Sequence, residues 1–441
     1  MTTTPKFRGR QVTAARHPAK SVNRRGFLRK ATSVATAVMA PQIIPSSALG
    51  LDGATPPSER ITVGAIGIGN RGTYDLGCFL EQHDAQVTAV CDVKQVRRNA
   101  AKELVDGRYQ NGNCRTFRDF RDLLAESQVD AVLIATGPNW HSTAAHYAAH
   151  AGKDIYCEKP CTKNIAESLE LKETMRRTAR VFQAGTQRRS LPHFAFACQL
   201  AREGKLGKLK TLYAHPAGMT ALMSGWLPAE PEPARDVVDW DLYLGPAAWR
   251  PYNAKLLDGF NFEKGGGLVG GGVLEWGSHC VDLCQWAMAD ASVPVEYNPP
   301  VDGQLTATYA NGVQLVLRET GWAPLGSCPV RFEGETGWVE VGDSGKMLFS
   351  SPELLAGSKI NAVPNYPATF HVRNFLDCVR TRSQPKTNAS AACNAHIACH
   401  AANIALALNR KVVYDPSTQL FVGDDEANRL RSEAKREPWR S

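Results

Sequence analysis

The feature that most constrains this chain is a glycine turn between an apolar segment and a helix-like segment. Residues 61–66 are apolar enough for a buried strand, and Gly67-Ile68-Gly69-Asn70-Arg71-Gly72 comes directly after them. Glycines at these positions permit a tight turn, close approach of a pyrophosphate, and close packing of helix on strand. The N–H groups at the start of that helix favour phosphates. Because isolated GxGxxG patterns are common, the prediction of a dinucleotide site depends on the pattern of the neighbouring segments.

The segments after the turn alternate between strand and helix patterns up to residue 187. Such alternation is typical of a parallel, doubly wound sheet. The strand candidates are residues 61–66, 85–91, 129–135, 154–157 and 181–184, and the helical candidates are residues 70–82, 94–107, 139–151 and 164–178. We therefore expect an α/β fold with an N-terminal Rossmann domain over residues 61–187.

The pattern changes after residue 188. Asn311-Gly312 separates two apolar segments and is the strongest short hairpin signal, and a second hairpin is expected around residues 334–337. Strands joined by hairpins form antiparallel sheets. We expect a C-terminal α+β domain with a large, mainly antiparallel open sheet over residues 188–415, followed by a polar tail over residues 416–441.

Asp92 extends the dinucleotide pattern. It ends the second strand candidate, 20 residues after Gly72, where a carboxylate binds the adenosine ribose hydroxyls. A carboxylate repels a 2′-phosphate, so we expect NAD as the cofactor, with NADP less favoured; Lys94 is near enough to keep NADP open. The same site is expected to include the turn residues Gly67, Gly69, Asn70, Arg71 and Gly72.

Two further segments carry groups suited to proton chemistry. Glu158-Lys159-Pro160 comes after the fourth apolar segment of the sheet, at the carboxyl end of a parallel strand, where open α/β sheets bind ligands. After the glycine-dense residues 265–272, Glu275, His279 and Asp282 are spaced i, i+4, i+7 and share one helix face. Their neighbours are largely apolar, which does not fit a solvated face and indicates a buried polar site.

These groups suit the oxidation of a secondary alcohol, which releases a hydride and a proton. A neutral His279 can accept the proton, because an unperturbed imidazole has a pKa of about 6.5. Lys159, as a cation, can stabilise the developing alkoxide. The sequence leaves open which of the two is the base. Tryptophans that could either stack on a sugar ring or serve ordinary packing are Trp226, Trp240 and Trp249.

The first 48 residues have the composition of an export signal. They hold nine Lys or Arg and no acidic residue, with Arg24-Arg25 ahead of the weakly apolar run 31–40. This order is typical of a twin-arginine (Tat) signal. We expect passage through the Tat translocase, a periplasmic or otherwise exported protein, and a linker over residues 49–60. The apolar run is about half of the roughly 20 residues that span a bilayer, so stable membrane insertion is not expected.

The leader also explains the formal charge of +8. The remaining chain has 42 basic and 43 acidic residues, which does not support nucleic-acid binding. The twelve cysteines include no CxxC pair and no Cys/His set with zinc-site spacing. We therefore expect no metal site and mostly buried thiols.

Together these segments resemble the glucose–fructose oxidoreductase/inositol dehydrogenase (Gfo/Idh/MocA) family, in particular its Tat-exported bacterial branch. The resemblance covers essentially the whole chain after the leader. It is carried by residues 67–72, 138–141, 158–160, 185–189, 240–246, the glycine-led helix with His279, and the ending around Pro438-Trp439.

The resemblance implies catalytic roles for Lys159 and His279. Glu275 stands where the family usually has aspartate, so it either touches the substrate or only orients His279. The resemblance also implies that cofactor contacts come from Thr136, His141, Glu158 and Gln187, and that substrate contacts come from Lys159, Arg188, Glu275 and His279.

The expected function is NAD-dependent hydride transfer to or from a secondary alcohol carbon of a sugar, polyol or glycoside. One alternative is an NAD-dependent glycoside hydrolase or lyase that oxidises its sugar only transiently. Another is a non-catalytic nucleotide- or sugar-binding protein, against which the presence of both Lys159 and His279 weighs. An exported enzyme has no obvious NAD supply, which favours a tightly bound, recycled cofactor. The family resemblance also suggests a homo-oligomer, either a dimer or a tetramer.

Overall fold

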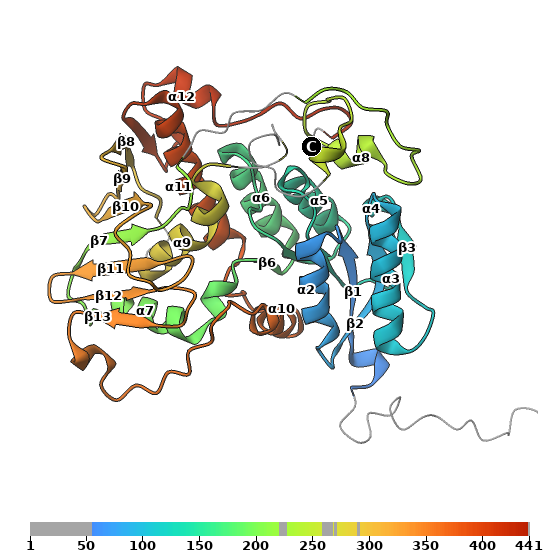
Figure 1. The fold of residues 1–441 in the computed structure, drawn as a ribbon, viewed down its shortest axis with the longest axis horizontal. Helices are drawn as coiled ribbons and strands as arrows, with labels where there is room; N and C mark the ends of the chain where they lie inside the picture. The colour runs from blue at the N-terminus through green and yellow to red at the C-terminus, as the bar shows by residue number, and fades with distance from the viewer. Residues whose placement is uncertain (1–54, 220–226, 258–267, 269–270, 289–291, 440–441) are drawn as a thin grey trace, which may run out of the picture. The chain divides into compact units, whose positions relative to one another are not determined.

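In a computed structural model of the chain, the strand before the glycine turn, β1 (Ile61–Ile66), lies inside a six-stranded parallel sheet (Figure 1). The structure describes residues 55–219, 227–257, 268, 271–288 and 292–439. The expected signal, residues 1–48, lies outside these ranges, as does the first half of the expected linker, residues 49–54. Residues Ser58–Ser441 cluster as one unit, which contains this sheet and a second, larger one.

The first sheet has the strand order β3-β2-β1-β4-β5-β6, with every pair parallel. Its other strands are β2 (Ala85–Cys91), β3 (Arg115–Phe117), β4 (Ala131–Ile134), β5 (Asp154–Cys157) and β6 (Phe182–Ala184). The helices between them are α2 (Asn70–Leu80), α3 (Gln95–Tyr109), α4 (Phe120–Leu124), α5 (Pro138–His150) and α6 (Ile165–Thr178). This order confirms the predicted Rossmann architecture.

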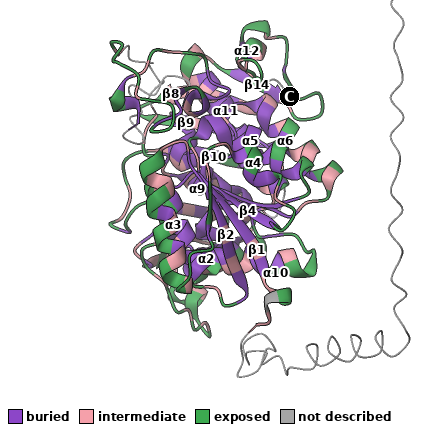
Figure 2. Cartoon of the chain, turned by 90° about the vertical axis from the view of Figure 1, so that its right-hand side faces the viewer, coloured by how far each residue is buried: buried purple, intermediate pink, exposed green. Residues whose placement is uncertain are grey.

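Most strands of this sheet could be predicted from their apolar sequences because their side chains are buried. β4 and β5 are buried at every residue, as expected for parallel strands covered on both faces (Figure 2). The edge strand β3 and the one-turn helix α4 were not predicted. β3 has three residues, none of them buried, so it lacks an apolar pattern.

The second sheet has nine strands in the order β13-β12-β11-β7-β10-β9-β8-β14-β15. Its strands are β7 (Leu209–Ala214), β8 (Glu296–Val301), β9 (Gln304–Thr308), β10 (Gln314–Arg318), β11 (Val330–Gly334), β12 (Trp338–Val341), β13 (Met347–Phe349), β14 (Val412–Asp415) and β15 (Leu420–Phe421). Only β7 and β10 pair in parallel among these neighbours. Both predicted hairpins, β9–β10 and β11–β12, are present, which confirms the mainly antiparallel sheet.

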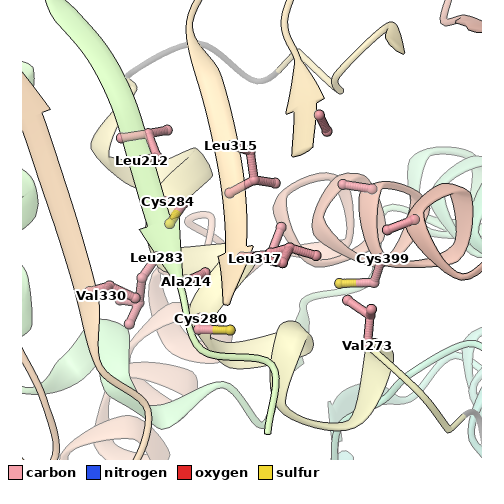
Figure 3. Close-up of a cluster of buried hydrophobic side chains, with 14 of the residues drawn as sticks. Leu212, Ala214, Val273, Cys280, Leu283, Cys284, Leu315, Leu317, Val330 and Cys399 are labelled. Atoms are coloured by element: carbon pink, nitrogen blue, oxygen red, sulfur yellow. The ribbon is translucent and has the colours of Figure 1, made fainter. Parts of the chain in front are cut away.

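The remaining helices are α7 (Pro192–Arg202), α8 (Trp240–Leu244), α9 (Leu274–Ala287), α10 (Thr369–Thr381), α11 (Ala389–Leu408) and α12 (Asp425–Arg429). α9 packs against the sheet and against α11. Figure 3 shows Cys280, Leu283 and Cys284 of α9 beside strand residues such as Leu212 and Leu317. All twelve cysteines are free and buried, which confirms their prediction as core thiols.

α10 belongs to the C-terminal half of the chain but packs on the Rossmann sheet. Its Phe375 contacts Phe79 of α2 and Tyr156 of β5 edge to face, with ring centroids 6.1 and 5.9 Å apart. Figure 1 shows α10 beside α2. The next helix, α11, connects the two sheets, because it contacts β6 of the parallel sheet and β8 of the nine-stranded sheet.

α11 has the length and apolar composition of a membrane-crossing helix, but most of it is buried inside the protein, as in a core helix. The residues after 415 are more structured than a polar tail would be. They include β15, α12 and Trp439, which is 3% exposed.

Candidate active site

A cavity of about 700 Å³ opens where the strands of the parallel sheet end. It is lined from the ends of β1, β2 and β5, from the loop after β4, and from α9. This is the edge at which open α/β sheets bind ligands. Nine of the ten predicted cofactor residues line it, namely Gly67, Gly69, Asn70, Arg71, Asp92, Thr136, His141, Glu158 and Gln187.

The glycine turn has the geometry its sequence predicts. Gly67 has a φ of 83°, the left-handed region that favours glycine. Gly72 does not line the cavity; a Cβ there would lie 2.1 Å from the carbonyl oxygen of Gly67, so this position must be glycine for α2 to pack on the turn. α2 begins at Asn70 and directs its first N–H groups to the turn, where phosphates bind.

Asp92 is fixed by the backbone of the turn and of the next loop. Its two oxygens accept hydrogen bonds from the N–H groups of Ile68 and Lys94, both at 2.8 Å. Burial raises the pKa of this carboxyl, while the two N–H donors oppose the rise. The carboxylate is thus held rigidly at the expected ribose position. Lys94, Arg97 and Arg118 line the same end of the cavity.

Glu158 accepts hydrogen bonds from three parts of the site. Its Oε1 accepts hydrogen bonds from Arg71 Nε at 3.0 Å and from Gln187 Nε2 at 2.7 Å, and its Oε2 accepts one from the backbone N–H of Lys159 at 3.0 Å. Arg71 also pairs with Asp75 at 2.9 Å. Arg71, predicted as a cofactor residue, therefore lines the cavity while its guanidinium holds two carboxyl groups.

Asp75 was not found from the sequence. It is fully buried beside Glu158, and burial together with the Glu158 charge raises its pKa well above the usual range. Burial alone would raise the pKa of Glu158 too, but Arg71 and Lys159 lower it. The pKa values of the two carboxyl groups are therefore shifted in opposite directions. The i, i+4 spacing of Arg71 and Asp75 on α2 is the local signal that could have marked this residue, whereas its neighbour Glu158 comes from the end of β5.

Lys159 reaches toward α9. Its Nζ donates to the carbonyl oxygen of Glu275 at 3.0 Å and lies 3.6 Å from Glu275 Oε2. Lys159 lines the cavity and Glu275 does not. Burial raises the pKa of Glu275, and the Lys159 charge opposes this. Glu275 thus contacts Lys159, a role different from the two that the sequence suggested.

His279 lines the cavity from α9 and is 4% exposed. Burial lowers its pKa well below the usual value, and the positive charges of Arg188, Lys159 and Arg71 lower it further. The imidazole is therefore neutral at neutral pH. Among the described residues, no hydrogen-bond partner meets its Nδ1.

Arg188 supplies a fixed cation on the same wall. It forms two hydrogen bonds with Asp343, at 3.0 and 2.6 Å, and its guanidinium lies 4.2 Å from the Tyr366 ring centroid and 5.6 Å from that of Trp276. Trp276 and Tyr366 also line the cavity. Neither aromatic residue was predicted from the sequence, although Trp276 is the residue immediately after Glu275.

Of the two candidate tryptophans that the structure describes, Trp240 has the packing role and Trp249 has neither of the two expected roles. The Trp240 side chain is 1% exposed and forms the core of a small layer near α5, so it does not offer a face to a sugar. Trp249 is 63% exposed and does not line the cavity. Trp226 lies outside the described residues. Across the described ranges, no group of three His, Cys, Asp or Glu is arranged to hold a metal ion.

His141, at the start of α5, lines the cavity and is almost fully buried. Its ring nitrogens are 2.8 Å from the carbonyl oxygen of Pro160 and 3.0 Å from that of Thr136. It thereby joins the loop after β4 to the loop that carries Lys159. Burial lowers the pKa of His141, and the two carbonyl groups oppose this.

Comparison with known proteins gives partial matches in sequence. One stretch is 36% identical over 129 residues to a glycosyl hydrolase family 109 protein of Saccharopolyspora erythraea, covering 28% of this chain and 27% of that protein. Another is 29% identical over 146 residues to myo-inositol 2-dehydrogenase of Thermotoga maritima, covering 33% of this chain and 42% of that protein. The chain thus matches less than half the length of these relatives.

Matches to solved structures extend further. The scyllo-inositol dehydrogenase of Lactobacillus casei, solved with NAD(H) and scyllo-inositol, has a TM-score of 0.55 at 17% identity, covering 80% of this chain and 99% of that one. At this identity the likeness concerns the fold. Residues 61–186 match the model described as the oxidoreductase family, NAD-binding Rossmann fold, and residues 221–441 match that of the C-terminal alpha/beta domain. The chain is therefore a member of the Gfo/Idh/MocA oxidoreductase family.

Proposed function

We propose that this protein is an NAD-dependent oxidoreductase that transfers a hydride to or from a secondary alcohol carbon of a sugar, polyol or glycoside. The observation that carries the proposal is one cavity lined both by the dinucleotide residues around Asp92 and by Lys159 and His279. The similarity to inositol dehydrogenases supports the substrate class. When bound, NAD supplies the hydride acceptor at its nicotinamide ring.

Lys159 and His279 have different roles at the alcohol oxygen. Lys159 stabilises the developing alkoxide as a cation, and its Nζ is held in place by the Glu275 carbonyl oxygen 3.0 Å away. His279 is neutral because burial and the nearby cations lower its pKa, so it can accept the hydroxyl proton. Glu275 acts as a positioning residue for Lys159.

The substrate side of the cavity includes Arg188, Trp276 and Tyr366. Arg188 is held by Asp343 with bidentate geometry, and such rigid donors suit the hydroxyl groups of a sugar. Trp276 and Tyr366 offer apolar ring surface next to that donor. We assign these residues to recognition of the sugar or polyol.

The second candidate is glycoside cleavage with no net redox change, which the similarity to glycosyl hydrolase family 109 proteins favours. Oxidation of a ring hydroxyl acidifies the adjacent C–H group. Loss of that proton would expel the anomeric leaving group and leave a double bond. In a hydrolase, water would add to this double bond, and the hydride would be returned afterwards. This reaction begins with the same step at Lys159 and His279, so only the products separate the two candidates.

The leader supports a proposal about location. Its paired arginines and absence of acidic residues suit export of the folded protein by the Tat translocase to the periplasm. A Tat substrate can bind NAD before it leaves the cytoplasm. We also propose a homo-oligomer, a dimer or tetramer, formed through the open face of the nine-stranded sheet. On that face, the guanidinium carbon of Arg331 lies 3.9 Å from the ring centroid of Trp338.

Replacing Lys159 or His279 with alanine should lower the turnover of alcohol oxidation by about 10²–10⁴-fold, the contribution of a positioned acid–base group. NAD binding, measured by calorimetry, should persist. Matched controls are the exposed residues Lys210 and His83, whose alanine variants should turn over normally. Near-normal turnover of the Lys159→Ala protein would remove the proposed mechanism.

The pH dependence of kcat/KM should lack an inflection from His279 near pH 6.5. Because the pKa of His279 is lowered, its neutral form persists as the pH falls through this value, and activity is lost only at the lower folded-state pKa. Profiles of the wild type and His279→Gln between about pH 5.5 and 8 test this. An inflection near 6.5 that disappears in the variant would contradict it.

Isotope transfer separates the two candidate functions. A sugar alcohol deuterated at the reacting carbon, mixed with a keto-sugar acceptor, should pass its deuterium to the acceptor through bound nicotinamide, as seen by mass spectrometry. In the glycosidase alternative, glycosides would be cleaved, and solvent deuterium would enter the carbon beside the transient carbonyl. Cleavage with that exchange, and no net oxidised product, would replace the first proposal by the second.

Changing Arg24 and Arg25 together to lysine should leave the protein in the cytoplasm, because Tat signals depend on the arginine pair. Cell fractionation with an antibody to the folded domain measures this. The control changes Arg8 and Arg10, which lie outside the pair, and should not alter export. Unchanged delivery of the double-lysine protein would exclude the Tat assignment.

A further inference from the structure

Residues 227–257 form a small folded layer, here called the cap. Its centre is Trp240, which stacks on Tyr243 with ring centroids 5.2 Å apart and an interplanar angle of 12°, and meets Tyr252 edge to face, also at 5.2 Å. Trp240 Nε1 donates to the carbonyl oxygen of Arg250 at 3.0 Å. The cap has its own apolar cluster of Val238, Trp240, Leu244, Ala247, Leu256, Leu257 and Leu268. It is therefore a structured element.

The cap is attached to the corner after β2. The N–H of Gln95 donates to the Val237 carbonyl oxygen at 2.9 Å, and the N–H of Asp239 donates to the Val93 carbonyl oxygen at 3.1 Å. These bonds flank an antiparallel bridge between Lys94 and Val238. The attachment lies two residues from Asp92, at the end of the cavity expected to hold the adenosine ribose.

A second attachment is to the start of α5. Asn139 Nδ2 donates to the carbonyl oxygens of Tyr243 at 3.1 Å and Leu244 at 2.9 Å, and Trp140 Nε1 donates to that of Leu242 at 2.6 Å. These side chains are buried, so the carbonyl groups of α8 find their partners on the Rossmann half. Separation of the cap would break these three hydrogen bonds.

The cap also contributes to the cavity wall. Its residues Leu242, Tyr243, Leu256 and Leu257 line the same cavity as Asp92 and Lys94. Lys94 Nζ donates to the Leu257 carbonyl oxygen at 2.9 Å, which ties this wall to the adenosine end. An apolar and aromatic wall suits the flat face of an adenine ring.

The C-terminal segment fastens the cap from outside. Arg436 donates to the carbonyl oxygens of Gly245 at 3.1 Å and Asp241 at 2.9 Å, and pairs with the Asp241 carboxylate at 2.5 Å. Trp439 packs edge to face on Trp140 with centroids 4.7 Å apart. Figure 1 shows the end of the chain beside α8. Neither Arg436 nor Trp439 lines the cavity.

We propose that the cap forms the adenine-side wall of the NAD site and, fastened by Arg436 and Trp439, retains NAD as a resident group. Release of NAD then requires the cap to separate from the corner after β2 and from α5. The inference rests on the proposed function for its choice of cofactor. It adds that the adenosine half is held by the cap, so that substrates exchange while NAD stays in place.

The first test weakens the fastening and leaves the cavity lining intact. Protein loaded with radiolabelled NAD is diluted into excess unlabelled NAD, and retained label is measured over time. Arg436→Ala removes several hydrogen bonds and an ion pair, so release should be about tenfold faster than in the wild type. The control Arg410→Ala removes a half-buried arginine paired with Asp424 and Glu426, and should not change release. Equal release from wild type and Arg436→Ala would overturn the proposal.

A second variant locks the cap. Lys94 and Val238 face each other as a non-hydrogen-bonded antiparallel pair, with a Cα separation of about 4.5 Å, which a disulfide can bridge. In Lys94→Cys/Val238→Cys protein, release of NAD should be at least about tenfold slower when oxidised than when reduced. Comparing two states of one protein cancels the loss of Lys94, and the native cysteines are buried. Identical release from the two states would show that NAD leaves without cap opening.

Neither measurement uses a substrate. Fast, cap-independent release would remove the proposal about retention and leave hydride transfer at Lys159 and His279 untouched. If NAD release is slow and depends on the cap but the protein does not oxidise alcohols, the proposed function is wrong. The proposal that the cap retains NAD would then still hold.

Discussion

The carboxylate of Glu158 is the interaction on which the rest of the site depends. It accepts hydrogen bonds from Arg71 on α2, from Gln187 after β6 and from the backbone of Lys159. A buried carboxylate is stable only when charge and hydrogen bonds compensate its lost hydration. Gly185 makes room for it, since a Cβ there would lie 2.4 Å from Glu158 Oε1. The glycine turn, the strand end and the loop after it are thus fixed to one another through a single side chain.

A second constraint concerns which part of the chain covers the dinucleotide site. The Rossmann half provides the turn and Asp92, yet the walls beside them come from residues far away in sequence. Cap carbonyl groups satisfy Asn139 and Trp140, and the end of the chain packs Trp439 on the other side of Trp140. The cofactor site is therefore complete only when the C-terminal half has folded back onto α5. This dependence fits a protein that would acquire its cofactor together with its fold.

How much the sequence could predict depends on how local each signal is. Three features could be predicted because each depends on residues close in sequence. They are the alternation of strands and helices, the glycine turn, and Asp92. Lys159 and His279 could be found from strand-end position and helix spacing. The cap wall and Trp439 could not, because their roles arise from partners on distant elements. Trp240 shows the same limit. From the sequence it could either stack on a sugar ring or pack in a core, and its burial in the cap shows that it packs.

The charges around the cavity indicate which group can carry the alcohol proton. Each cation that lowers the pKa of His279 has its own carboxylate: Arg188 pairs with Asp343, Lys159 with Glu275 and Arg71 with Glu158. These pairs fix positive groups along the wall without a large net charge. Burial and the Glu158 charge raise the pKa of Asp75, which does not line the cavity. Among the described residues that line the cavity, burial lowers the pKa of both His141 and His279, and the charges of Arg188 and Lys159 lower that of His279 further. In the proposed reaction, Arg188 and Lys159 would repel an imidazolium formed at His279.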